Sequence, residues 1–183
     1  MAEVLNSGEE LDREISSWPP NDEPMFAYSK HDGRLSEWSG SFHIYSDLGV
    51  ANDWNMLRCA RLLLLMTLIE CSLHQLRSVS SSAQAQLQAI QALEKSKLTI
   101  ATIIDDLIAS FPYCLGRGDA SCNMPTAGVG TSGFALLWPT GLILRCPFSS
   151  HKQKAIAAET IQYIGHSLGL RRALYLKAAW LNG

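Results

Sequence analysis

The chain has 183 residues, of which 47% are hydrophobic and only 17% are charged, a balance that excludes a disordered tail and suits one domain with a sizeable core. The formal net charge is −2 and no long basic run is present, so we expect no direct nucleic-acid binding. The two longest apolar runs, residues 62–69 and 134–144, are shorter than the roughly 18 to 20 residues that cross a bilayer. We therefore expect no membrane contact and an intracellular protein, cytoplasmic or nuclear.

The five cysteines form no CxxC pair, which is typical of reduced thiols in an intracellular protein. The acidic N-terminus lacks the apolar core of a signal peptide. No histidine lies at a spacing that would complete a zinc site with the cysteines, and the glycine-rich segment 116–133 has no lysine for a nucleotide-binding loop. We expect no metal and no cofactor.

The first 50 residues are predicted to form a helix and a loop that pack on a helical core, residues 51–183. Residues 9–18 place apolar side chains at helical spacing before two prolines, which predicts the helix. Residues 21–41 have the composition of a loop.

Residues 52–78 give the strongest helix signal. Asn52 or Asp53 is expected to cap this helix, because a short polar side chain accepts the free amide hydrogens of the first turn. Apolar residues cover almost its full circumference from Leu57 to Leu73. Such a pattern predicts a buried central helix.

A second long helix is predicted from a polar entry at residues 78–88 to about Ile108. It is expected to end within residues 110–119, where Pro112, Gly116 and Gly118 follow in succession. Asp105 and Asp106 would then close this helix.

The run at residues 134–144 is apolar except for Pro139, Thr140 and Gly141. No segment of the chain shows the strict alternation of a strand, so we interpret this run as a buried helix with the proline near its first turn. Two more helices are predicted, one capped by Ser149 or Ser150 and one at residues 170–181. The fold class is therefore all-α, a single domain of about five to six packed helices.

Several stretches in order resemble one family. They are "WNMLRCARLLL", "IDDLIASFPYCLG", "GFALLWP" and "IQYIGHSLGLRRAL". Together they closely resemble the C-terminal part of the fungal-specific transcription factor domain, the regulatory region of zinc binuclear cluster activators. The resemblance covers about residues 9–180 and implies a helical, nuclear domain that responds to a ligand or partner. The six closely spaced cysteines of the zinc cluster are missing, which implies a relative deficient in DNA binding.

Four residues are candidate acid–base groups: Asp105, Asp106, His74 and His166. The two carboxylates at a predicted helix end face the negative end of the helix dipole and suit acid–base chemistry; alternatively, one is exposed and the other binds Arg58 or Arg61. His74 follows Glu70 by four residues, which would orient an imidazole base, or it marks a helix end in solvent. His166 lies between two glycines, either facing a cavity or capping a helix.

The candidate ligand-binding residues are polar or aromatic side chains on the predicted helices and the loop before them. These are His43, Asp53, Trp54, Arg58, Phe134, Trp138 and Tyr163. His43, Asp53 and Trp54 are expected near the mouth of a pocket, and the aromatic residues as its walls; the alternative for each aromatic is ordinary core packing.

Two functions are compatible with these features. The first is a DNA-binding-deficient, transcription-factor-like domain that binds a small molecule or a protein partner, and a homodimer is also compatible. The alternative is a cofactor-independent enzyme of natural-product biosynthesis, a cyclase, isomerase or dehydratase, since such chemistry needs only a shaped apolar pocket and one or two acid–base groups.

Overall fold

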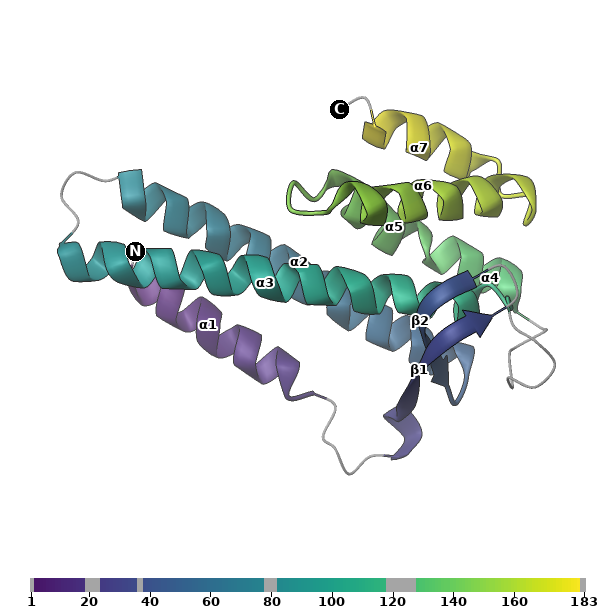
Figure 1. Cartoon of the computed structure of the whole chain (residues 1–183), viewed down its shortest axis with the longest axis horizontal. Coiled ribbons are helices and arrows are strands. Elements are labelled where there is room, and N and C mark those ends of the chain that lie inside the picture. Colours follow the sequence, from purple (N-terminus) through teal and green to yellow (C-terminus); the bar gives the residue numbers. More distant parts are fainter. Residues whose placement is uncertain (1, 19–23, 36–37, 78–81, 118–127, 182–183) are drawn as a thin grey trace.

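The computed structural model describes residues 2–18, 24–35, 38–77, 82–117 and 128–181, and helices make up most of them. The all-α class is confirmed, with one small antiparallel hairpin added (Figure 1). No helix among the described residues is both long enough and apolar enough to span a membrane.

Two long antiparallel helices, α2 (Leu48–Arg77) and α3 (Ala83–Cys114), form the body of the fold, and the shorter α1 (Ala2–Ser16) packs on α2 (Figure 1). The helix α2 begins earlier than predicted. Its first turn is capped by Asp47, whose Oδ1 accepts the amide hydrogen of Val50 at 2.9 Å, and not by Asn52 or Asp53, which lie within the helix.

Helix α3 continues through Pro112 and ends at Cys114, within the predicted segment 110–119. The buried Pro112 removes one amide donor from the last turn of the helix. As a consequence, Asp105 and Asp106 lie about two turns inside the helix. They are not at its negative end.

The core lies between α2 and α3 and extends toward the C-terminal helices. Its fully buried side chains include Leu62 and Ile69 of α2 and Ile104 and Phe111 of α3. The prediction of all-round burial for residues 57–73 is wrong, because Leu63 within this segment is 41% exposed, and Met56 just before it is 49% exposed. Burial follows one face of this helix.

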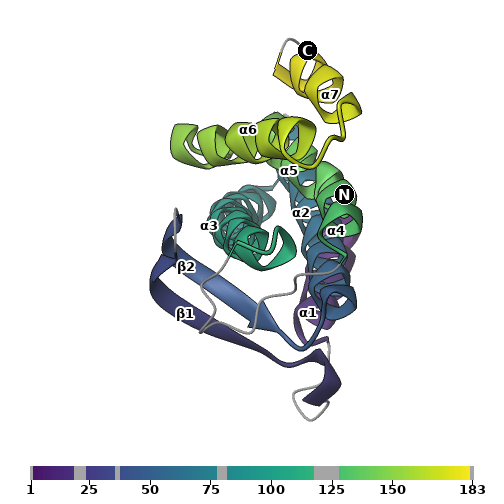
Figure 2. The ribbon, with the colours of Figure 1, turned by 90° about the vertical axis from the view of Figure 1, so that its right-hand side faces the viewer.

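A β-hairpin replaces most of the predicted loop. Strands β1 (Tyr28–Leu35) and β2 (Trp38–Tyr45) pair antiparallel, with Tyr28 opposite Tyr45 and Leu35 opposite Trp38. Two strands alone are marginally stable. This hairpin is stabilised by packing β2 on α3, which lies between the hairpin and α6 in the end-on view (Figure 2).

Four helices complete the chain on the other side of α3. They are α4 (Val129–Ala135), α5 (Leu137–Arg145), α6 (His151–His166) and α7 (Arg172–Leu181). The run at 134–144, predicted as one helix, thus belongs to two consecutive helices that meet at Leu136. Pro139 lies in the first turn of α5, where its missing amide hydrogen removes no helical bond.

The predicted cap of α6 by Ser150 is confirmed. The Ser150 hydroxyl accepts the Gln153 amide hydrogen at 3.2 Å, and the Gln153 side chain accepts the Ser150 amide hydrogen at 2.8 Å. This reciprocal pair is a capping box, which fixes the start of α6 from local sequence alone.

Candidate functional site

A cluster of polar side chains lies where the β-hairpin meets α2 and α3. We call it the polar cluster and define it as Lys30, His43, Tyr45, Asn55, Arg58 and Asp106. Arg58 of α2 is buried at its centre and donates from Nη1 to Tyr45 Oη at 2.7 Å and to Asn55 Oδ1 at 3.3 Å. These bonds satisfy a guanidinium whose burial would otherwise cost several kcal/mol.

His43 contacts both Tyr45 and Asp106 of the cluster, and its side chain is only 1% exposed. Its Nδ1 lies 3.1 Å from Tyr45 Oη, and its Nε2 lies 3.5 Å from Asp106 Oδ1. Because Tyr45 Oη accepts from Arg58, its own hydrogen is free to point to Nδ1. We therefore assign the tautomer with the hydrogen on Nε2, which faces the carboxylate.

Burial, followed by the nearby charge of Arg58, lowers the pKa of His43 from 6.5 to about 3, against the opposing effect of Asp106. His43 is therefore neutral at physiological pH. Asp106 also accepts a hydrogen bond from Lys30 Nζ at 2.9 Å, so its charge has a cationic partner without the imidazole.

Aromatic rings cover the cationic centre of the cluster. The guanidinium carbon of Arg58 lies 5.2 Å from the ring centre of Tyr28 and 5.3 Å from that of Trp54, within the range of cation–π attraction. The indole of Trp54 donates to the carbonyl of Phe26 at 2.8 Å. The cluster thus joins the hairpin to both long helices, which is a structural role.

An open apolar pocket lies between the C-terminal helices, away from the polar cluster. We call it the apolar pocket; its volume is about 600 Å³. It is lined by side chains of α4, α5, α7 and the turn before α7: Phe134, Leu137, Trp138, Leu170, Arg172 and Leu176.

Two aromatic walls of the apolar pocket face solvent. Phe134 is 64% exposed and Trp138 is 52% exposed. They are four residues apart on either side of the α4–α5 break, so both project to the same side of this helical segment. Leaving two large aromatic side chains uncovered at one concave surface is typical of a binding site.

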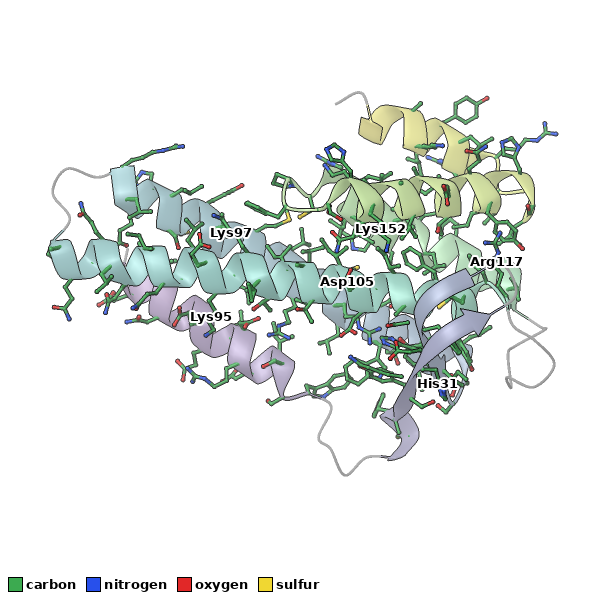
Figure 3. All side chains as sticks on the ribbon, in the orientation of Figure 1. His31, Lys95, Lys97, Asp105, Arg117 and Lys152 are labelled. Carbon is green, nitrogen blue, oxygen red and sulfur yellow. The ribbon has the colours of Figure 1, made fainter. Side chains whose placement is uncertain are left out.

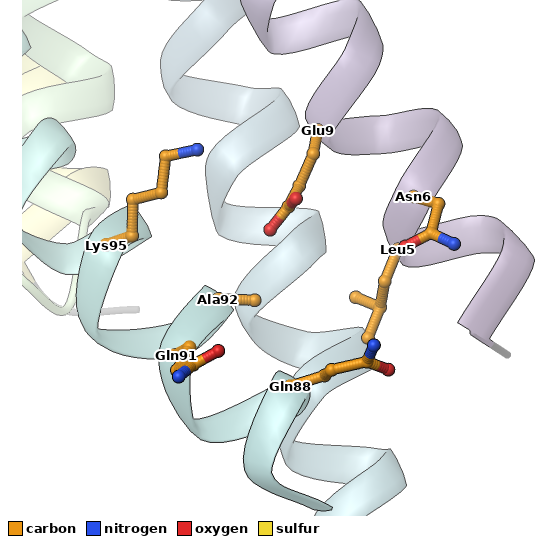
Figure 4. A pocket seen from close by; sticks show the side chains of 7 residues that line it. All are labelled: Leu5, Asn6, Glu9, Gln88, Gln91, Ala92 and Lys95. Carbon is orange, nitrogen blue, oxygen red and sulfur yellow. The ribbon is translucent and has the colours of Figure 1, made fainter. Parts of the chain in front are cut away.

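A second, more polar hollow of about 340 Å³ lies between α1 and α3 (Figure 4). Leu5, Asn6 and Glu9 come from α1, and four residues of α3 face them: Gln88, Gln91, Ala92 and Lys95. Its lining has no aromatic side chain. It offers a ligand less apolar surface than the apolar pocket does.

The structure does not bring the four candidate acid–base residues together. Asp105 lies on α3, where Figure 3 labels it. It accepts a hydrogen bond from Gln153 Nε2 of α6 at 2.8 Å, whereas Asp106 belongs to the polar cluster. His74 and His166 are exposed in the last turns of α2 and α6. His74 and His166 therefore do not share a site with the aspartates.

The candidate ligand-binding residues fall into two groups. His43, Trp54 and Arg58 meet at the polar cluster, whereas Phe134 and Trp138 line the apolar pocket. Two others belong to neither group. Asp53 is exposed on α2, and the ring of Tyr163 is covered by Arg117, whose guanidinium carbon lies 3.7 Å from its centre (Figure 3).

Several residues of the polar cluster and of the apolar pocket were not predicted from the sequence. Lys30, Tyr28 and Asn55 were not singled out, because the hairpin that positions the first two was not predicted. The α7 side of the apolar pocket, including Arg172, was also missed. The apolar spacing at residues 170–176 indicated a helix, but no local pattern showed which other helices it packs against.

Among the residues that the structure describes, no group of three or more histidine, cysteine or acidic side chains is arranged to hold a metal ion. Comparisons of the chain with protein-family models, with curated proteins and with solved structures gave no match.

Proposed function

We propose that this protein is a helical binding domain that holds an apolar small molecule in the apolar pocket. The observation that carries the proposal is the exposure of Phe134 and Trp138 on the same concave surface. Covering a large apolar side chain contributes about 1.5–3 kcal/mol. A ligand that covers both aromatic rings therefore gains much of its affinity from them.

The size of the pocket supports a small molecule as the ligand. Its volume of about 600 Å³ lies within the range of about 300–1,000 Å³ that is usual for ligand pockets. The described lining residues are apolar apart from Arg172, and all but Leu170 lie on helices α4, α5 and α7.

The resemblance to the regulatory region of fungal zinc cluster activators is part of the proposal. A domain of that kind without its zinc cluster would respond to a ligand without reading DNA. The helical architecture agrees with this interpretation, and a protein partner at the same surface is its nearest competitor.

The proposal is tested by titrating the protein with phenylnaphthylamine, a neutral apolar dye that fluoresces in apolar surroundings. We expect saturable binding that weakens by about tenfold or more in Trp138→Ala and in Phe134→Ala, since about 1.4 kcal/mol corresponds to tenfold. The control is Leu98→Ala, which removes an exposed apolar side chain of α3 outside the pocket. Equal affinity in all four proteins would overturn the proposal.

The enzyme alternative is supported by one observation, the contact between His43 and Asp106. A carboxylate that orients an imidazole is the arrangement of a general base. His43 is buried, however, and Nδ1 faces Tyr45, so a substrate would reach only the partly exposed Asp106. Turnover of an apolar biosynthetic intermediate that is lost in Asp106→Asn and retained in Asp105→Asn would favour the enzyme.

A further inference from the structure

Charge is distributed unevenly along the chain. Residues 1–106 contain fifteen acidic residues against eight lysines and arginines, whereas residues 107–183 contain two acidic residues against seven. All six lining residues of the apolar pocket belong to the second segment. The pocket is therefore built from the basic segment of the chain, and an excess of basic residues favours anionic ligands.

Among the lining residues that the structure describes, the charged one is Arg172, the first residue of α7. Among the described residues, no side chain forms an ion pair or a hydrogen bond with its guanidinium. The next cation on this helix differs, because Lys177 Nζ donates to Gln162 of α6 at 3.1 Å. Arg172 is therefore the cation that remains available to a molecule in the pocket.

We infer that the ligand of the apolar pocket is an anionic amphiphile, a hydrocarbon body with a carboxylate at one end. This inference rests on the proposed function. The hydrocarbon covers Phe134, Trp138 and Leu176, and the carboxylate binds Arg172 at the edge. A guanidinium suits this role because its planar donors match both oxygens of a carboxylate.

The inference predicts different affinities for three probes whose hydrocarbon chains have the same length. Dodecanoate, dodecanol and dodecyltrimethylammonium carry an anionic, a neutral and a cationic head group, and each is used below its micelle concentration to displace phenylnaphthylamine. At a pH well above the pKa of a free carboxylic acid, we expect dodecanoate to bind about tenfold more tightly than dodecanol. The cationic probe should bind most weakly.

The matched variants are Arg172→Gln and Arg171→Gln. Arg171 is exposed and adjacent in sequence, but it does not line the pocket. In Arg172→Gln we expect the preference for dodecanoate over dodecanol, measured as the ratio of their affinities within the variant, to disappear. In Arg171→Gln the preference should remain.

Two results distinguish the failure of this inference from the failure of the proposed function. The first is that the dye binds through Phe134 and Trp138 while dodecanol and dodecanoate bind with equal affinity, or while Arg172→Gln still prefers dodecanoate. Such a result shows that the inference is wrong and leaves the proposed binding of an apolar molecule in the apolar pocket intact. If the dye does not bind at all, both are wrong. Binding to vesicles of phosphatidylglycerol without binding of monomeric dodecanoate would also overturn the inference, because the basic surface would then recognise a membrane.

Discussion

The Nε2 atom of His43 on β2 lies 3.5 Å from Oδ1 of Asp106 on α3, and this contact attaches the β-hairpin to the longest helix. Lys30 of β1 reaches the same carboxylate oxygen at 2.9 Å. One aspartate thus contacts both strands of the hairpin. The stability of this corner should depend on the polar cluster as well as on apolar packing.

Replacing Tyr45 by phenylalanine should destabilise the protein. The lost hydroxyl accepts from Arg58 and faces Nδ1 of His43, so its removal takes one hydrogen-bond partner from each of two buried groups. We expect the free energy of unfolding to fall by about 1–3 kcal/mol. The measurement is urea unfolding followed by circular dichroism.

The control for this change is Tyr175→Phe, because Tyr175 is 78% exposed on α7. Its loss should leave the unfolding free energy within about 0.5 kcal/mol of the wild type. If the two variants are equally stable, the hydrogen-bond chain through Tyr45 does not stabilise the fold.

The depressed pKa of His43 makes stability depend on pH. The folded protein has a His43 pKa of about 3, against 6.5 for a free histidine, so between these values the unfolded chain binds more protons. The free energy of unfolding should therefore fall as the pH is lowered from about 6.5 towards 3. His43 adds at most about 1.4 kcal/mol per pH unit to this slope.

His43→Asn removes this contribution, so the stability of the variant should change less steeply with pH than that of the wild type. His31→Asn serves as the control, since His31 is exposed on β1. Equal slopes for the wild type and His43→Asn in urea unfolding at several pH values would contradict the assignment of a buried, neutral imidazole.

A glycine allows α7 to approach α6. A Cβ added at Gly165 would lie 2.5 Å from Leu174 Cδ2, so Gly165→Ala should displace α7, which forms one wall of the apolar pocket. We expect a loss of about 1–3 kcal/mol in unfolding free energy from overpacking and weaker binding of phenylnaphthylamine.

The matched change is Gly130→Ala in α4, where an added Cβ meets nothing within 4 Å. Alanine is favoured over glycine in a helix by up to about 1 kcal/mol, so this variant should be as stable as the wild type or more stable. A stable Gly165→Ala protein with unchanged dye affinity would show that α7 tolerates the displacement or does not bind the dye.

Local sequence signals predicted the helices but not the sites. The capping box of Ser150 and Gln153 and the long apolar periodicities act within a few residues, so the all-α class could be read from the sequence. The hairpin could not, because its strands lack regular alternation and depend on packing against α3. Lys30 and Asp106 are 76 residues apart in sequence, and no local pattern joins them.

For the same reason, only the aromatic side of the apolar pocket could be predicted from the sequence. Phe134 and Trp138 are large aromatic residues close together in one apolar run, and they were predicted as walls of a pocket. Leu170, Arg172 and Leu176 come from a helix whose position depends on tertiary packing against α5 and α6. The position of Arg172 beside the two aromatic rings, from which we infer an anionic ligand, therefore could be seen only in the folded structure.

The location of a bound apolar molecule is tested most directly by the indole signals in a nitrogen–proton correlation spectrum of isotope-labelled protein. The signal of Trp138, assigned with Trp138→Phe, is predicted to shift progressively as phenylnaphthylamine is added. The signal of Trp54, whose indole is bonded to the Phe26 carbonyl beside the polar cluster, should stay in place. A shift of the Trp54 signal with an unchanged Trp138 signal would contradict binding in the apolar pocket.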